Sequence, residues 1–258
     1  MKVTILGCGP SQGVPVIGQI WGDCDPSNMK NRRSRPSIVV QDGDRNILVD
    51  TSPDIRDQLL SNDISLIDAV LFTHLHYDHV GGLGELRTLS FLANRRIEVF
   101  GTQEVLDGLE RSASYLFKAD ASDDANLYKP SADAHPIVYG EAFEAEGVHV
   151  LPFCQDHGIC DSAGFRFGKF AYSTDVALLD DAAFAALEGI EVWIVDCLRE
   201  KPHPTHAHFE RTLEWIDRVK PKRAIFTHMS LESDYAKTLA RCPNGVEPGF
   251  DGMVLDIH

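Results

Sequence analysis

Short apolar runs rich in β-branched residues alternate with longer amphipathic segments along the whole chain. Such runs are typical of buried strands, and apolar residues at helical spacing are typical of helices that cover a core. The predicted strands cover residues 3–6, 37–41, 46–50, 69–73, 97–100, 136–139, 148–154, 165–167, 170–173, 191–197, 223–227 and 253–257. The predicted helices cover residues 53–61, 84–94, 102–112, 180–187, 206–219 and 233–241. We therefore expect an α/β fold.

The order of these elements favours two sheets over one. Strands come first, with a hairpin predicted over residues 38–49 across Asp42-Gly43-Asp44, and helices become frequent later. This order suits two mixed sheets packed face to face with helices outside better than one doubly wound parallel sheet. No long linker, internal repeat or low-complexity tract is visible, so residues 1–258 are predicted to form one domain. The polar residues 119–133 are predicted to form a mobile loop.

Composition narrows the choice of partner and location. The 258 residues include 24 Lys and Arg against 39 Asp and Glu, a net charge of −15, and 43% are hydrophobic. This balance is typical of a globular protein whose acidic surface repels nucleic acids. The chain shows no membrane-spanning apolar stretch, no signal peptide and no CxxC pair among its six cysteines. We expect a cytoplasmic protein that does not contact membranes and for which nucleic acid is a poor partner.

A dense group of metal-binding side chains follows the apolar strand at residues 69–72. The next ten residues read THLHYDHVGG. Four of them carry side chains that bind metals: His74, His76, Asp78 and His79. Imidazole and carboxylate together suit zinc, manganese or iron. A single histidine could simply lie on the surface or be hydrogen-bonded in the core. Burying four such side chains without a metal would leave several polar groups without hydrogen-bond partners.

Three more ligand-type residues follow predicted strands downstream: His157, Asp175 and His228. Each stands after an apolar run, where loops gather at the edge of a sheet. Seven candidates are the number that two adjacent metals need. Asp50 and Asp196 also end apolar strands, and we expect them to orient histidines through hydrogen bonds rather than to bind metal.

The HLHYDH motif with a later His, Asp and His resembles the metallo-β-lactamase superfamily over essentially the whole chain. The resemblance implies a four-layer αβ/βα sandwich, a hydrolase, and two divalent ions, zinc or manganese, per chain. The implied ligands are, for the first metal, His74, His76 and His157; for the second, Asp78, His79 and His228; and for both, the bridging Asp175. We also predict a catalytic role for Asp78. Paired metals can catalyse the hydrolysis of phosphodiesters, thioesters and lactones alike, so the metal ligands do not identify the substrate.

A further histidine resembles the catalytic one of the phosphodiesterase branch. Residues 205–210 (THAHFE) follow the strand that ends at Cys197 and are predicted to begin a helix. In that branch a histidine that binds no metal contacts the phosphate and protonates the leaving oxygen. Imidazole suits this role because it titrates near neutral pH. We assign it to His206, with His203 and His208 as alternatives.

Both ends of the chain resemble the phosphoribosyl cyclic phosphodiesterase (PhnP-like) branch, which opens a cyclic phosphate on ribose. The similar segments are residues 13–15, 21–22, 32–33 and 249–253. That branch carries a cysteine cluster after the Trp-Gly pair and a histidine three residues past the last ligand, which together hold a structural zinc. Here these positions offer only Cys24 and Leu231, so we predict no third, structural zinc.

The tRNA 3′-processing endonucleases form a related branch. They carry a long tRNA-gripping insertion between the third ligand histidine and the bridging aspartate. In this chain His157 and Asp175 are only 18 positions apart, so no such arm fits. This reading is therefore the runner-up.

Residues that contact the substrate are harder to predict. Residues 30–35 form the only basic cluster, which is usually a solvated loop, but Arg32 and Arg33 could contact a phosphate or base. The glycine-rich turn at residues 7–13, which includes Ser11, could face the phosphate through its N–H groups.

The predicted function is therefore that of a dinuclear-metal phosphodiesterase acting on a small ribose phosphate or nucleotide, cyclic ones included. The alternatives left open are a tRNA 3′-processing ribonuclease, a thioesterase or lactonase of the same fold, and a non-catalytic nucleotide-binding protein. A homodimer is compatible with the sequence.

Overall fold

The computed structural model describes residues 1–118 and 129–258, which form two seven-stranded sheets. The strands of the first sheet, in spatial order, are β14 (Val254–Asp256), β1 (Lys2–Gly7), β2 (Ser37–Asp42), β3 (Arg45–Val49), β4 (Ala69–Leu71), β5 (Ile97–Gly101) and β6 (Ala132–Pro136). Those of the second are β13 (Val246–Pro248), β12 (Arg223–Thr227), β11 (Val192–Asp196), β10 (Phe170–Ser173), β9 (Asp161–Phe167), β8 (Val148–Asp156) and β7 (Phe143–Ala145). Both sheets mix parallel and antiparallel pairs, as predicted.

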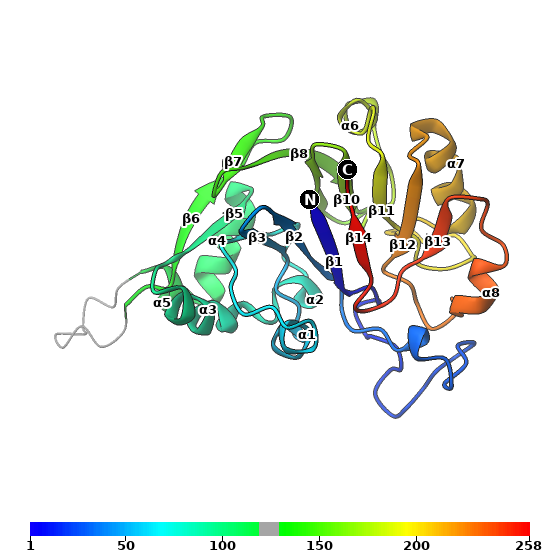
Figure 1. Ribbon diagram of the computed structural model, residues 1–258, viewed down its shortest axis with the longest axis horizontal. Coiled ribbons are helices and arrows are strands. Elements are labelled where there is room, and N and C mark those ends of the chain that lie inside the picture. Colours follow the sequence, from blue (N-terminus) through cyan, green and yellow to red (C-terminus); the bar gives the residue numbers. More distant parts are fainter. Residues whose placement is uncertain (119–128) are drawn as a thin grey trace.

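Helices cover the outer faces of the sheets. They are α1 (Ile55–Ser61), α2 (Tyr77–Val80), α3 (Leu86–Ala93), α4 (Gln103–Ser112), α5 (Ser114–Phe117), α6 (Asp181–Ala186), α7 (Phe209–Val219) and α8 (Tyr235–Leu239), with 3-10 turns η1 (Met29–Asn31) and η2 (Leu83–Glu85). Figure 1 shows α3 and α5 beside the first sheet and α7 and α8 beside the second, on opposite sides of the molecule. The two termini lie close together, where β1 pairs with β14. No helix in the described ranges has the length and apolarity that a bilayer crossing requires.

Two apolar clusters hold these layers together. The larger one joins the facing sides of both sheets, for example Ile38 and Val49 of the first with Phe165 and Ile194 of the second. The smaller one lies between the first sheet and its helices. Strand β11 is buried along its whole length because it has parallel neighbours on both edges and is covered on both faces. The rigid strands therefore fix the loops at their ends, which carry the site.

Most predicted elements are confirmed, and the exceptions are informative. The hairpin of β2 and β3 is present, with Ile38 opposite Val49. The predicted strand at 136–139 is wrong: β6 ends at Pro136, and residues 137–139 line a cavity described below. The short strands β7 and β13 were not predicted. Most of the loop predicted at 119–133 lies outside the described residues, but its end at Ala132 and Asp133 belongs to β6.

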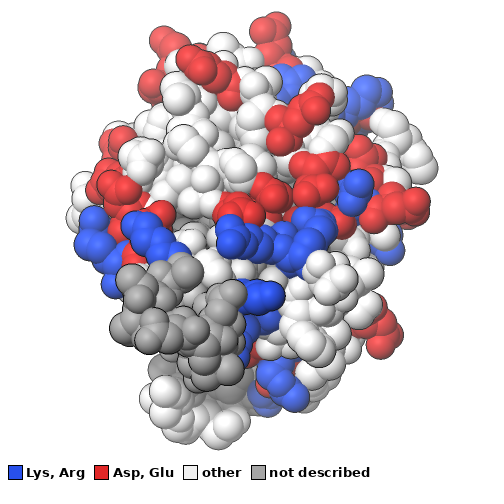
Figure 2. All heavy atoms as spheres, turned by 90° about the vertical axis from the view of Figure 1, so that its left-hand side faces the viewer, with Lys and Arg blue, Asp and Glu red and all other residues white. Residues whose placement is uncertain are grey.

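The charge of the surface is unevenly distributed. Figure 2 shows a band of basic side chains next to acidic ones on the face that carries β6 and α5. Arg95 lies 2.9 Å from both Asp68 and Glu146, and Arg96 lies 2.7 Å from Asp133. These arginines are therefore tied to carboxylates and do not form a free basic surface.

Candidate metal centre

The seven predicted ligands come together at the ends of four strands. The segment from His74 to His79 follows β4 of the first sheet, and the other three ligands follow β8, β10 and β12 of the second. The site therefore lies where loops from the two sheets meet. We call these seven residues the histidine cluster: His74, His76, Asp78, His79, His157, Asp175 and His228.

One half of the cluster brings four possible ligand atoms to one place. His157 Nε2 lies 3.3 Å from His76 Nδ1 and 3.6 Å from Asp175 Oδ1, and His74 Nε2 lies 3.9 Å from the same oxygen. All four atoms lie within 4.8 Å of one another. This spacing leaves room for one ion among them.

The other half shares Asp175. His79 Nε2 lies 3.1 Å from Asp175 Oδ2, and His228 Nε2 lies 3.3 Å from Asp175 Oδ1. Asp78 Oδ2 lies 3.4 Å from both of these ring nitrogens. Because Asp175 belongs to both groups, its carboxylate is placed to bridge two ions.

The hydrogen bonding of the cluster fits bound metal. The Nε2 atoms of His74, His79 and His228 are buried and make no hydrogen bond to any described residue. Such unsatisfied polar atoms are rare in folded proteins because each costs free energy. Imidazole nitrogens and carboxylate oxygens in this number are the ligand set of zinc and manganese sites. The residues present therefore fit two divalent ions.

The charges of the cluster point the same way. Burial opposes ionisation of Asp175, but the nearby His228 and His79 outweigh it and hold the pKa of this carboxyl well below its usual range. Burial lowers the pKa of His74, which keeps that ring neutral. Asp175 and Asp78 outweigh burial at His228 and raise its pKa to about 9. Ring nitrogens and carboxylates thus face one another across the cluster, an arrangement that a cation would complete.

Outer residues fix the orientation of the rings. Asp50 Oδ2 lies 2.7 Å from His79 Nδ1 and also accepts a hydrogen bond from Thr73 Oγ1 at 2.8 Å, which confirms the orienting role expected of Asp50. The main-chain oxygen of Thr205 accepts a hydrogen bond from His157 Nδ1 at 2.7 Å. No sequence pattern marks Thr205 for this role, because every residue has a carbonyl oxygen.

The backbone is strained at three strand ends, two of them in the cluster and one beside it. Asp50, Asp175 and His228 have φ values of 63°, 53° and 58°. Residues other than glycine rarely adopt this left-handed backbone conformation, which costs about 1 kcal/mol or more per residue. Such strain is concentrated at functional sites, where the surrounding structure holds the residue in place.

His206 stands beside the cluster, outside both four-residue groups, and forms a third group of possible ligands with Asp196 and His228. Its Nδ1 lies 2.8 Å from Asp196 Oδ2, while its Nε2 faces Asp175 Oδ1 at 3.9 Å. Asp196 thus orients His206 rather than one of the predicted ligands. The helix predicted from 206 begins later, at Phe209, because His208 has an extended backbone and takes the N-cap position. His206 therefore lies in the loop before α7, with its ring 4.5 Å from that of His228.

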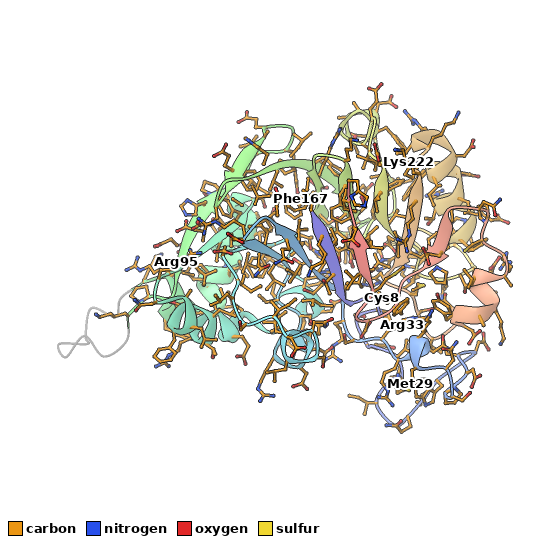
Figure 3. All side chains as sticks on the ribbon, viewed as in Figure 1. Cys8, Met29, Arg33, Arg95, Phe167 and Lys222 are labelled. Atoms are coloured by element: carbon orange, nitrogen blue, oxygen red, sulfur yellow. The ribbon has the colours of Figure 1, made fainter. Side chains whose placement is uncertain are left out.

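Two of the residues predicted to bind substrate have other positions. Arg33 is only 1% exposed, and its guanidinium donates hydrogen bonds to the main-chain oxygens of Ser230 and Ser233. The guanidinium thus serves the packing of the loop, while Arg33 is also among the residues that line the cavity described next, so its contact with substrate stays a prediction. Figure 3 shows Arg33 within the packed side chains, with Met29 at the outer edge of the same loop. Ser11 is exposed in the turn after β1.

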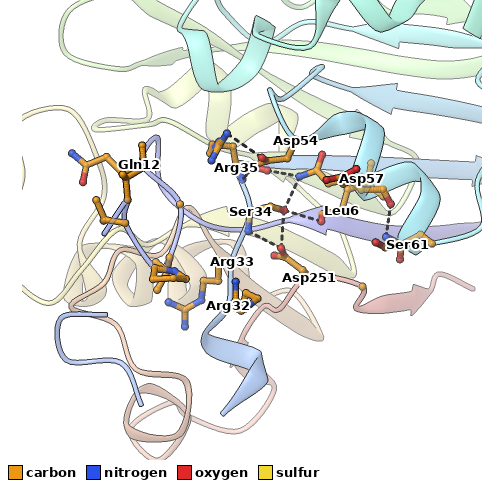
Figure 4. Close-up of a pocket in the computed structure, with 18 of the residues that line it drawn as sticks. Leu6, Gln12, Arg32, Arg33, Ser34, Arg35, Asp54, Asp57, Ser61 and Asp251 are labelled. Atoms are coloured by element: carbon orange, nitrogen blue, oxygen red, sulfur yellow. Dashed lines mark hydrogen bonds and ion pairs between the residues drawn. The ribbon is translucent and has the colours of Figure 1, made fainter. Parts of the chain in front are cut away.

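Arg32 is exposed and lines a cavity of about 510 Å³ together with Arg35. Figure 4 shows this cavity, in which Arg35 pairs with Asp54 at 3.0 Å. Arg32 also lies over the ring of Trp21, 5.4 Å from its centre. No member of the histidine cluster is among the residues that line this cavity. The structure therefore separates the basic loop from the metal centre.

Comparison with known proteins agrees with the geometry. Residues 45–229 match the sequence profile of the "Beta-lactamase superfamily domain". A solved diphosphatase from the PhnP family has 34% sequence identity and a TM-score of 0.88, covering 98% of this chain and 96% of that one. Zinc-bound PqqB from Methylobacterium extorquens has 22% identity and a TM-score of 0.78 with full coverage of both chains, and shows the shared fold.

A curated relative extends beyond this chain. The octanoyltransferase of Porphyromonas gingivalis is 30% identical over 98% of this chain, but the match covers only 51% of that protein. The chain thus spans about half the length of this relative.

Proposed function

The chain belongs to the metallo-β-lactamase superfamily, and we propose that within it the protein is a metal-dependent phosphodiesterase that hydrolyses a small ribose phosphate or nucleotide, cyclic ones included. The observation that carries the proposal is His206. A fixed imidazole with one nitrogen held by Asp196 and the other facing a metal centre is suited to protonate a leaving oxygen. The similarity to a PhnP-family diphosphatase over nearly the whole chain supports hydrolysis at phosphorus.

In this proposal the histidine cluster holds two divalent ions. His74, His76 and His157 would hold one, Asp78, His79 and His228 the other, and Asp175 both. When bound, such a pair supplies Lewis-acid stabilisation of phosphoryl charge and lowers the pKa of water. Asp50 and the Thr205 carbonyl keep two of the rings in the orientation that binding requires.

His206 would act on the leaving group. Asp196 Oδ2 accepts a hydrogen bond from Nδ1 of this ring and another from the Val176 N–H at 3.0 Å, so the carboxylate is itself fixed. The ring therefore presents Nε2 toward the cluster, where it can give its proton to the departing alkoxide. The side chain of His206 is only 10% exposed, which limits exchange of this proton with bulk water.

A second candidate is hydrolysis of an acyl ester or thioester. The match to an octanoyltransferase over nearly all of this chain favours it. Because the match covers only half of that relative, the transfer activity in its name need not belong to the matching half. We therefore place this candidate second.

One assay separates the two. The metal-loaded protein is expected to hydrolyse bis(p-nitrophenyl) phosphate, to lose this activity with a chelator, and to regain it with Zn²⁺ or Mn²⁺. p-Nitrophenyl octanoate and an octanoyl thioester are tested under the same conditions. Faster turnover of the acyl substrates with no turnover of the diester would overturn the proposal, as would diester hydrolysis that persists in chelator.

A further inference from the structure

A cavity of about 670 Å³ opens directly beside the histidine cluster, and His74 and His76 form part of its wall. The rest of the wall comes from the start of α4, the segment 137–139 after β6, and the turn at 159–161 between β8 and β9. This volume is typical of sites for small organic ligands. A substrate whose phosphate binds at the cluster would therefore extend into the cavity.

The chemistry of this wall is apolar and acidic. Val105 and Ile137 are buried in it, while Val138 and Ile159 are 57% and 73% exposed. The lining also includes two exposed carboxylates, Glu104 and Asp161, and contains no Lys or Arg; apart from Tyr139 and the two histidines, its remaining residues are Leu75, Thr102, Gln103 and Cys160. Away from the cluster, the wall thus offers contacts for a neutral ring and no cationic side chain for an anion.

Tyr139 lines the same cavity and is influenced by the same two carboxylates. Burial raises the pKa of its phenol, and the surrounding groups Cys154, Asp161 and Glu104 act in the same direction. The hydroxyl therefore keeps its proton and remains a hydrogen-bond donor inside the cavity. A second phosphate placed here would meet this field without a counter-charge.

The position of His206 indicates which part of the substrate enters. His206 does not line the cavity; its ring lies 4.5 Å from that of His228 and 4.8 Å from that of His157. The leaving oxygen must lie near His206, so the cavity beside His74 and His76 is placed for the arm that stays on phosphorus.

We propose that this cavity binds the retained, uncharged, ring-bearing arm of the phosphodiester, such as a nucleoside, and that Glu104 and Asp161 reject an arm with its own phosphate. The inference rests on the phosphodiesterase function proposed above. It names the substrate class as monoanionic diesters of uncharged nucleosides.

A matched pair of chromogenic diesters tests the proposal with the metal-loaded full chain. Thymidine 5′-(p-nitrophenyl phosphate) has an uncharged retained arm, and its 3′-phosphorylated form differs only by a remote phosphate. The KM of the second is expected to be at least about tenfold higher, with kcat changed less than about threefold. Calorimetric binding of the products, thymidine 5′-phosphate and thymidine 3′,5′-bisphosphate, should show the same order of affinity.

The double variant Glu104→Gln, Asp161→Asn should remove most of this discrimination. Its KM for the 3′-phosphorylated diester is expected to fall several-fold, with that of the uncharged diester little changed. Glu188→Gln, Glu214→Gln makes the same change in net charge at exposed positions outside the cavity wall and should leave both values as they are.

The outcomes separate the two proposals. Equal KM and product affinity for both diesters, or discrimination that persists in the double variant, would overturn the cavity assignment alone. Hydrolysis of neither diester would overturn the phosphodiesterase function, and the product affinities would still report on the cavity.

Discussion

Two regions of the molecule bury polar side chains to a similar depth but treat them in opposite ways. In the histidine cluster, the Nε2 atoms of three histidines make no hydrogen bond to described residues. The second region, which we call the Arg33 clamp, joins the loop at residues 24–33 to residues 230–235. It consists of Cys24, Asn31, Arg33 and Asp234 with the main-chain oxygens of Ser230 and Ser233.

Most polar groups of the clamp form hydrogen bonds with one another. Asn31 Nδ2 donates to Asp234 Oδ2 at 2.7 Å, and Asn31 Oδ1 accepts from the Tyr235 N–H at 2.7 Å. Arg33 has no carboxylate partner in the described chain; its two NH2 groups donate to carbonyl and amide oxygens and to Cys24 Sγ, and only its buried Nε has no partner among the described residues. Gly22 allows the loop to approach, since a Cβ there would lie 2.0 Å from Leu231 Cδ1.

The difference shows what each region can do. A buried polar network in which nearly every group has a partner, as in the clamp, fixes the shape of the chain. A buried network with unsatisfied nitrogens around carboxylates is completed by a cation. Cys24 donates to the Leu231 oxygen, so hydrogen bonds join the two positions at which the similar branch was expected to carry zinc ligands. The absence of a third zinc stays a prediction.

The largest effect is expected from Asp175→Ala, which removes the carboxylate that both metal groups share. Both ions should be lost, and phosphodiesterase activity should fall on the order of 10³-fold or more. Elemental analysis after desalting measures the metal per chain. Asp234→Ala, the matched loss of a clamp carboxylate, should keep both ions. Full metal occupancy in Asp175→Ala would contradict bridging.

His206→Ala tests the residue that stands beside the cluster. Loss of the proposed proton donor should lower kcat for a diester with an alkoxide leaving group by about 10²- to 10³-fold while two metals per chain remain. His203→Ala is the control, because its ring lies 5.3 Å from that of His206 but has no bond to Asp196. Metal loss in His206→Ala would make this histidine a ligand and would remove the main support for the proposed function.

Arg33→Ala should break the clamp and leave the cluster intact. The oxygens of Ser230 and Ser233 would lose buried donors, so we expect the free energy of unfolding to fall by about 3 kcal/mol. Arg33→Lys should recover only part of it, since one ammonium cannot match the planar geometry of the guanidinium. Denaturant unfolding measures the change, and metal content is the control. A stability equal to that of the parent would show that the clamp does not hold the loop.

Asp251 is a buried carboxylate outside both the histidine cluster and the Arg33 clamp, so it tests the effect of burial on a pKa. It accepts hydrogen bonds from Ser34 N, Ser34 Oγ and Cys8 N at 2.6, 2.7 and 3.1 Å, yet burial dominates and raises its pKa to about 6. The folded protein then holds this proton more tightly than the unfolded chain, whose reference value is 3.8. The associated stability is present below about pH 4 and is lost as the pH rises through about 6.

Asp251→Asn should remove this dependence while keeping an acceptor for Ser34. Relative to the variant, the parent should lose up to about 3 kcal/mol of unfolding free energy between pH 4 and pH 7. Unfolding of both proteins at several pH values measures the difference, in which the other titrating groups cancel. A difference that does not change with pH would contradict the raised pKa.

The sequence was informative where chemistry is local. Strands were predicted because apolar runs are local, and four cluster ligands were predicted because they lie within six residues, from His74 to His79. Metal binding by the cluster stays a prediction, but the structure does bring those side chains together. The start of α7 was misplaced by three residues because the extended backbone of His208 depends on its surroundings.

Long-range contacts without a residue signature could not be predicted. The basic run suggested a substrate contact for Arg33. Its actual partners are main-chain oxygens about 200 positions away, and no motif marks such partners. Residues 137–139 were read as a strand because they are apolar, but their neighbours form a cavity rather than a sheet. The cavity wall itself comes from three separate segments and has no pattern in the sequence.

The smallest effect is expected from Arg32→Ala, the neighbour of the buried arginine. Arg32 is exposed, so its loss should change the free energy of unfolding by no more than about 0.5 kcal/mol, against about 3 kcal/mol for Arg33. Its cavity contains no cluster residue, so the KM for phosphodiesters should stay within about twofold. A clear rise in KM with unchanged stability would instead place Arg32 on the substrate, as the sequence suggested, and would join the basic loop to the metal centre.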